Sequence, residues 1–220
     1  RYPYPTDVND RKLPVYLADT IDRYAQVATM LKGAPYDRLH NTVGVYFTRY
    51  SQMGNLTTGI LLSPAIWRSD AYGKEVLWHE MNHYAYFTLI EYDKAVRPYM
   101  WVYEGLAEYF AHGSMPGLRE DQVRTCCSFT LSATFPDYNA NYWAGESVYW
   151  FMEDTYGKEQ VRTFIQSTYS NAVGESISSA FGKPSGMLEN EWKVWVERNQ
   201  LKMKSKWKIL YMPLICGLNA

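Results

Sequence analysis

The chain has 220 residues, a length that suits one domain with room for two lobes and for a sizeable core without disulfide or structural-metal staples. Its 22 Lys and Arg residues nearly balance its 23 Asp and Glu residues, so the net charge of −1 excludes the basic field that draws proteins to nucleic acid or acidic lipid. No apolar run reaches the roughly 18 residues of a transmembrane helix, so we expect no membrane span.

The composition leaves other questions open. Aromatic residues make up 16% of the chain, and such side chains either line a substrate groove or, more commonly, sit half buried in a core. Three cysteines, Cys126, Cys127 and Cys216, form neither a disulfide framework nor the spacing of a zinc site. The chain begins with Arg1 rather than Met, which agrees with a processed, secreted form or with a trimmed chain, and secretion is an expectation on this ground alone.

The first part of the chain is predicted to contain one helix and two or three strands. Between Leu13 and Leu31 the apolar side chains recur at helical spacing, and Gly33 provides a stop. Apolar residues then alternate with smaller or polar ones over residues 43–47, as is typical of a strand. Residues 57–62 are rich in β-prone side chains and are flanked by turn residues, so a second strand is expected there.

The rest of the chain is predicted to be helical, interrupted by a loop rich in Gly, Arg and Asp. Helices are expected at about 74–90, 101–112, 140–156, 159–169 and 187–202. Gly113 and Gly157 stand where two of them should stop. Strands followed by helices indicate an α+β domain with a cleft between two lobes. The expected lobes are 1–112 and 113–205, and the tail 206–220 has no predicted role.

One motif in the predicted helix 74–90 carries chemistry. Residues 79–83 read His-Glu-Met-Asn-His, an H-E-x-x-H pattern. Because positions i and i+4 share a helix face, His79 and His83 can reach one ion, and zinc accepts imidazole nitrogen at about 2.0–2.1 Å. Glu80 would lie beside the water that keeps the fourth position of a catalytic zinc. The pattern also arises by chance in a helix with two unrelated histidines and a solvated glutamate, which remains the alternative.

A second helix supplies a third candidate ligand. Residues 101–109 read Trp-Val-Tyr-Glu-Gly-Leu-Ala-Glu-Tyr. The carboxylate of Glu104 therefore lies on a second predicted helix, about twenty residues after the histidines. Two helices can then complete a His-His-Glu set, one of the known catalytic zinc arrangements.

The H-E-x-x-H pattern followed by E-G-x-A-E resembles the gluzincin metallopeptidases, within them the peptidase MA-like group of thermolysin-like and aminopeptidase-N-like enzymes. The resemblance covers roughly residues 43–195 in the order of elements, although few of these residues belong to the motifs. It implies a thermolysin-like zincin catalytic domain, with a small mixed β-sheet and N-terminal helix before a mostly helical lobe. It also implies one catalytic Zn2+ bound by His79, His83 and Glu104, with Glu80 as general base and a peptide or protein as substrate.

The same resemblance suggests roles for four further residues. Glu108, one turn after Glu104, would accept the free N–H of a ligating histidine, or else it is a solvated helix charge. Residues 142–148 resemble the Y-x-x-G-x-x-V segment of aminopeptidase-N-like enzymes, which would make Tyr142 an oxyanion donor, or else it is a packing tyrosine. Gly59 and Ile60 would belong to an edge strand that binds the substrate backbone, or else to an ordinary core strand.

Departures from the family pattern narrow the activity. No G-x-M-E-N segment precedes the metal helix, so the free amine of an exopeptidase substrate has no predicted site and endopeptidase action is favoured. The metzincin extension is absent too, because residues 84–103 contain no histidine. His112 is too far along its helix to be a ligand and is interpreted as a histidine that favours the helix dipole.

Three other functions remain as alternatives. The first is a catalytically inactive metal- or peptide-binding module of the same fold. The second is a structural zinc site, for which the cysteines lack the spacing. The third is a metal-dependent hydrolase of a substrate other than a peptide, since the ligand set does not define the substrate.

Overall fold

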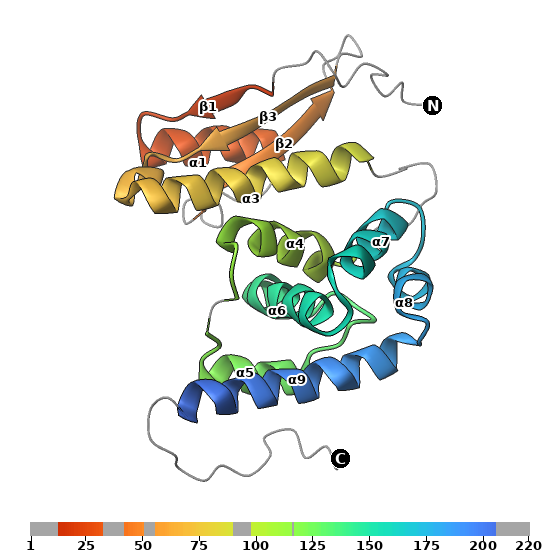
Figure 1. Ribbon diagram of the computed structural model, residues 1–220. Coiled ribbons are helices and arrows are strands. Elements are labelled where there is room, and N and C mark those ends of the chain that lie inside the picture. The colour runs from red at the N-terminus through yellow and green to blue at the C-terminus, as the bar shows by residue number, and fades with distance from the viewer. Residues whose placement is uncertain (1–12, 33–41, 51–55, 90–97, 116, 206–220) are drawn as a thin grey trace. The chain divides into compact units, whose positions relative to one another are not determined.

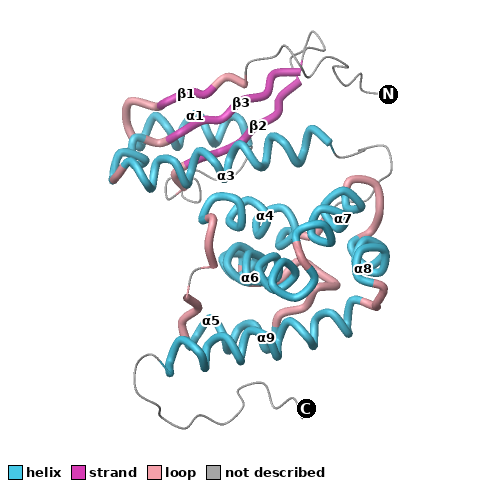
Figure 2. Tube along the Cα trace, viewed as in Figure 1, coloured by secondary structure: helices cyan, strands magenta, loops and turns pink. Residues whose placement is uncertain are grey.

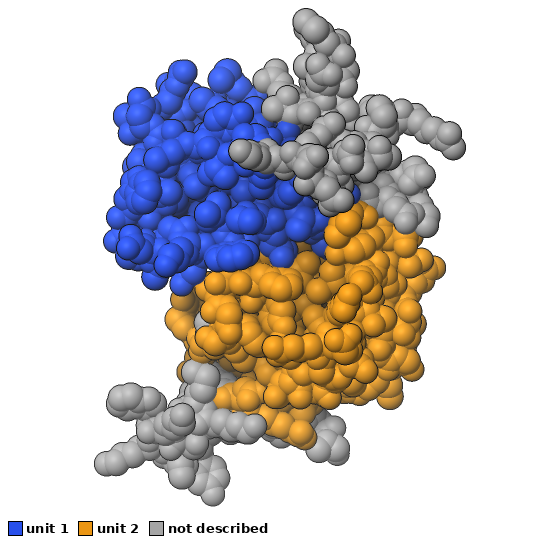
Figure 3. Space-filling model, turned by 45° about the horizontal axis from the view of Figure 1, so that its top comes forward, with its two compact units in different colours: residues 1–88 blue, residues 89–220 orange. Residues whose placement is uncertain are grey.

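A computed structural model describes residues 13–32, 42–50, 56–89, 98–115 and 117–205 of the chain (Figure 1). The described part is mixed α+β and mostly helical, with one small sheet (Figure 2). It divides into two compact units, residues 1–88 and 89–220, which are coloured separately in Figure 3. The sequence boundary expected near residue 112 lies after the second predicted metal helix, whereas the boundary between these units lies before it.

The first unit holds the sheet and the first helices. Its strands are β1 (Val15–Leu17), β2 (Gly44–Tyr50) and β3 (Leu56–Leu62), in the order β1-β3-β2. β1 runs parallel to β3, and β2 runs antiparallel to it. The helices of this unit are α1 (Ile21–Lys32) and α3 (Asp70–Leu89), with a short 3-10 helix η1 (Pro64–Arg68) before α3.

The alternation of side chains along β2 and β3 gives the sheet two apolar faces. On one face Val45, Phe47 and Leu61 pack against Tyr24 and Ala28 of α1. On the other face the buried residues Ile60, Leu62 and Ile66 are covered by partly buried apolar side chains, among them Val76 and Leu77 of α3. The sheet is therefore a layer between α1 and α3, and α3 is positioned by the face that carries Ile60.

The helix predicted from Leu13 is wrong in its first part, because residues 15–17 form β1 and the helix begins at Ile21. The stripe of apolar residues suits either element over so short a stretch, and pairing with β3 decides between them. The predicted strands at 43–47 and 57–62 are confirmed as β2 and β3.

The second unit is entirely helical in the residues that the structure describes. Its helices are α4 (Met100–His112), α5 (Glu120–Ser128), α6 (Tyr138–Tyr156), α7 (Lys158–Thr168), α8 (Val173–Phe181) and α9 (Ser185–Ser205). Four of these confirm predicted helices, and Gly113 ends α4 in the left-handed conformation, with φ 63°. α5 replaces part of the predicted loop, since Val123 and Cys126 bury one side of it. α8 is not among the predicted helices. No described helix has the length and apolarity to span a membrane.

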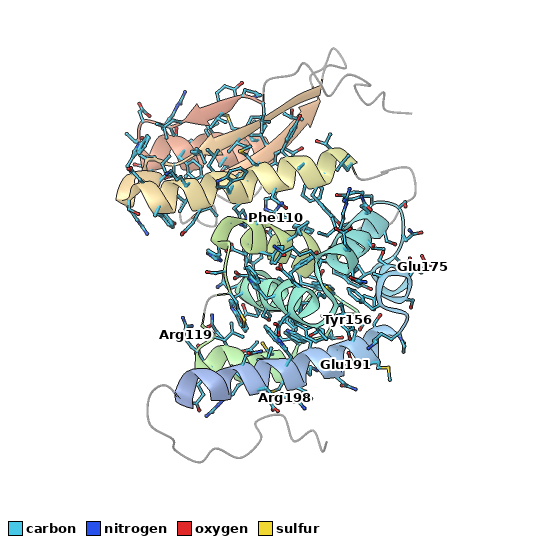
Figure 4. The ribbon with its side chains drawn as sticks, viewed as in Figure 1. Phe110, Arg119, Tyr156, Glu175, Glu191 and Arg198 are labelled. Carbon is cyan, nitrogen blue, oxygen red and sulfur yellow. The ribbon has the colours of Figure 1, made fainter. Side chains whose placement is uncertain are left out.

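Polar contacts join the C-terminal helices of this unit. Lys183, which follows α8, donates to the hydroxyl of Tyr156 at 2.9 Å and to a carboxylate oxygen of Glu191 at 2.8 Å. Tyr156, at the end of α6, also donates to Glu191 on α9, and both residues are labelled in Figure 4.

Cys127 is disulfide-bonded, whereas burial raises the pKa of the free thiol of Cys126 to about 12.

Candidate metal centre

The two histidines of the H-E-x-x-H motif meet on α3, as their i,i+4 spacing predicts. Their Nε2 atoms are 3.0 Å apart, and their rings are nearly perpendicular, with an interplanar angle of 87°. Two ligands bound tetrahedrally at 2.0–2.1 Å from one zinc lie about 3.3 Å apart. The two imidazoles are thus arranged much as a shared ion would require. His83 is buried and His79 is partly buried.

Glu80 lies against the sheet of the same unit. Its Oε2 atom accepts a hydrogen bond of 2.5 Å from the backbone N–H of Tyr46 on β2, and the side chain is buried. A Cβ atom at Gly44 would come within 2.8 Å of both Cγ and Oε1 of Glu80, so the carboxylate fits because residue 44 has no side chain. A hydrogen bond from a backbone N–H to a carboxylate is short and strong. β2 therefore fixes the carboxylate that the sequence proposes as general base.

The edge-strand role predicted for Gly59 and Ile60 is wrong for this sheet. β3 is its central strand, with Gly59 opposite Phe47 of β2 and Ile60 opposite Val15 of β1. The N–H of Ile60 donates to the carbonyl of Pro14 at 3.0 Å, and its side chain has no exposed surface. Backbone groups that already pair with neighbouring strands cannot receive a substrate strand, so the alternative of a core strand holds.

In the second unit, two glycines bring α4 and α6 together. A Cβ atom at Gly105 would lie 2.3 Å from the carbonyl carbon of Gly145, and one at Gly145 would lie 2.5 Å from the carbonyl oxygen of Trp101. The two backbones approach this closely only because neither position has a side chain. Both glycines belong to the motifs that drew attention to Glu104 and Tyr142. Their role in packing, however, was not foreseen.

This crossing places Tyr142 of α6 close enough to Glu104 of α4 for the charge of the carboxylate to act on the phenol. Burial, the charge of Glu104 and the neighbouring Tyr138 raise the pKa of Tyr142 far above its ordinary value, so its hydroxyl stays protonated. Burial and the same charge raise the pKa of Tyr103 to about 12. Glu104 is itself buried. The surroundings of this buried carboxylate therefore keep both phenols neutral.

One turn further along, a histidine joins two carboxylates. Nδ1 of His112 lies 2.9 Å from Oε1 of Glu146, and Nε2 of His112 lies 3.4 Å from Oε2 of Glu108. Trp150 also donates to Glu146 at 3.2 Å. Sequence reasoning missed Glu146 and left His112 aside, although the i,i+4 spacing of Glu108 and His112 was visible. The role of Glu108 toward a ligating histidine stays a prediction.

The residues predicted to bind the metal come from both units. The predicted ligands His79 and His83 lie on α3 in the first, together with the predicted base Glu80, and the predicted ligand Glu104 lies on α4 in the second. The packing of the first unit positions the two histidines, and the packing of the second unit positions the carboxylate. No protein family, curated protein or solved structure matches this chain in comparisons of sequence and fold.

Proposed function

We propose that the protein is a zinc-dependent peptidase, with endopeptidase action favoured. His79, His83 and Glu104 bind one Zn2+, and Glu80 is the general base. The observation that carries this proposal is the approach of the two histidine Nε2 atoms to 3.0 Å on one face of α3. Glu80, the residue that follows His79, has its carboxylate held by the backbone of β2. The gluzincin resemblance of the two motifs supports a peptide as the substrate.

The donors suit this metal. Two imidazole nitrogens and one carboxylate are a catalytic zinc set, which leaves a fourth position for water or substrate. A structural zinc site would fill that position with Cys or His. Among the described cysteines, Cys127 is disulfide-bonded and Cys126 is a buried thiol with a raised pKa, and neither state favours a thiolate ligand.

The protein's own groups divide the work of hydrolysis. When bound, zinc makes a water more acidic and polarises the peptide carbonyl. Glu80 takes the proton of the attacking water, and the hydrogen bond from Tyr46 holds its carboxylate in place while it does so. Tyr142, which its surroundings keep neutral, donates a hydrogen bond to the developing oxyanion. Glu80 then gives its proton to the leaving amine.

The proposal is tested by metal analysis and peptide cleavage on Glu80→Gln. Gln keeps the size and the acceptor for Tyr46 but cannot take a proton, so we expect unchanged zinc content and a loss of kcat/KM of about 100-fold or more. Glu159→Gln, on the exposed surface of α7, is the matched control and should behave as the wild type. Full activity of Glu80→Gln at unchanged zinc content would remove the mechanism.

The same assay separates the alternatives. Bound zinc without cleavage of a peptide library would favour a catalytically inactive metal- or peptide-binding module. Cleavage of peptides blocked at their N-terminus distinguishes an endopeptidase, which accepts them, from an aminopeptidase, which does not. Hydrolysis of other metal-hydrolase substrates but not of peptides would keep the mechanism and change the substrate class.

A further inference from the structure

A second group of metal-ligating side chains lies on α4 and α6 and shares no residue with the predicted zinc ligands. Glu108 and His112 of α4 and Glu146 of α6 each offer one donor atom, and these three atoms lie within 4.8 Å of one another. Donors that bind one ion at about 2.1 Å lie up to about 4.2 Å apart. Small rotations of the side chains would therefore bring all three donors around a single ion.

The close crossing of α4 and α6 brings these residues together (Figure 1). Gly105, Glu108 and His112 follow the spacing of one helix face, and Gly105 is the residue at which α4 meets Gly145 of α6. Glu146 is the next residue along α6. Nδ1 of His112 lies 2.9 Å from Oε1 of Glu146, and Nε2 of His112 lies 3.4 Å from Oε2 of Glu108. One compact unit therefore holds the whole group.

Glu146 is the member of the group that most needs a cation beside it. Only 1% of its surface is exposed, and buried charges in proteins are paired or bind metals. Among the described residues its partners are His112 and the indole N–H of Trp150, both at Oε1, and neither is a permanent cation. A histidine is charged only when it is protonated, whereas a divalent ion always carries its charge. Oε2 of Glu146 accepts no hydrogen bond from the described residues.

The other two members can adjust to an ion and admit it from solvent. The side chain of His112 is 33% exposed and that of Glu108 is 21% exposed, so waters can complete the coordination on this side. Trp150 donates to Glu146 at 3.2 Å, and hydrogen bonds of this kind orient a carboxylate that binds a metal. The group thus combines one fixed ligand with two that can rotate.

We propose that Glu108, His112 and Glu146 bind a second divalent ion, which cross-links α4 to α6. One imidazole nitrogen and two carboxylate oxygens suit zinc or a similar transition ion better than calcium, which takes about six to eight oxygen ligands. His112 binds through one of its two ring nitrogens. The site uses its own residues, so it stands whether or not the protein is a peptidase.

The experiment counts the zinc ions bound per chain after dialysis of the full chain against a zinc buffer, by elemental analysis. The wild type should bind one ion at each site. His112→Gln and Glu146→Gln should each lose one ion and keep the other. The double variant His79→Gln/His83→Gln lacks two ligands of the predicted catalytic ion, and it should keep the ion of the second site.

Two controls separate a lost ligand from a lost fold. Glu159→Gln makes the same chemical change as Glu146→Gln on the exposed surface of α7, so its zinc content should equal that of the wild type. Thermal unfolding without metal shows whether each variant is folded. If the buried change Glu146→Gln prevents folding, His112→Gln decides alone, because its side chain is partly exposed at the end of α4. Zinc should raise the unfolding temperature less in His112→Gln than in the wild type, since an ion that binds the native state stabilises it.

The pattern of losses distinguishes this proposal from the proposed function. Zinc content of His112→Gln equal to that of the wild type would overturn the second site and leave the catalytic site standing. A single ion that is lost in His112→Gln but kept in His79→Gln/His83→Gln would support the second site and overturn zinc binding by the two histidines of α3. A wild-type chain that binds no zinc would overturn both.

Discussion

The crossing of α4 and α6 leaves no room for a methyl group at Gly105. A Cβ atom there would be 2.3 Å from the carbonyl carbon and 2.6 Å from the Cα atom of Gly145, whereas ordinary contacts begin at 3.4 Å. Both opposing atoms belong to the backbone, so no side-chain rotation relieves the contact. In Gly105→Ala the two helices must therefore separate by about 1 Å, and a closely packed interior resists such a shift.

Two opposing effects give the size of the change. Replacing Gly by Ala in an unhindered helix stabilises it by about 1 kcal/mol. Forcing an extra carbon into a packed core costs about 1–3 kcal/mol, and a contact between two backbones belongs at the upper end of that range. We expect Gly105→Ala to lose about 2 kcal/mol of unfolding free energy, which lowers the unfolding temperature by about 4–8 °C for a chain of this length.

Urea and thermal unfolding followed by far-UV circular dichroism measure this change. Gly186→Ala is the control, because a Cβ atom at this position near the start of α9 meets nothing within 4 Å, and it should be neutral or stabilising. The two substitutions are chemically identical, so opposite signs of their changes in unfolding free energy would be due to the contact between α4 and α6. A Gly105→Ala protein as stable as the wild type would show that α4 and α6 do not approach as described.

Two further predictions concern a strand and a surface cluster. In Gly44→Ala the new methyl group would push the carboxylate of Glu80 away from β2. Peptidase activity should therefore fall by about 10-fold or more, while the zinc content stays the same. An unchanged kcat/KM would refute the positioning of Glu80 by β2. The carboxyl of Glu191 is partly desolvated, which alone would raise its pKa, but hydrogen bonds from Lys183 outweigh this and lower the pKa below its ordinary value of 4.5. The resulting stability is present above about pH 4.5 and is lost as the pH falls through the lower folded-state pKa. Glu191→Gln should therefore reduce the unfolding free energy at pH 7 by less than about 1 kcal/mol, because solvent screens the ion pair with Lys183. It should also make stability fall less steeply as the pH is lowered. An unchanged urea midpoint both at pH 7 and in acid would count against the ion pair.

Local patterns in the sequence determined the elements that carry the candidate ligands. The helix of His79 and His83 and the helix of Glu104 follow from unbroken helical segments, and Gly113 ends the second because glycine adopts a left-handed conformation at little cost. The approach of the histidine nitrogens follows from the same source, because an i,i+4 pair meets whenever the helix forms.

Only the tertiary structure decided the rest. Residues 15–17 became a strand and β3 a central one because strand pairing depends on partners far away in the chain, which a local pattern does not contain. The hydrogen bond from Tyr46 to Glu80 and the contact of Gly105 with Gly145 each join residues more than thirty positions apart. Side chains that are distant in sequence become neighbours only when their elements pack. The sequence therefore named the chemical groups, and packing determined what holds each of them in place.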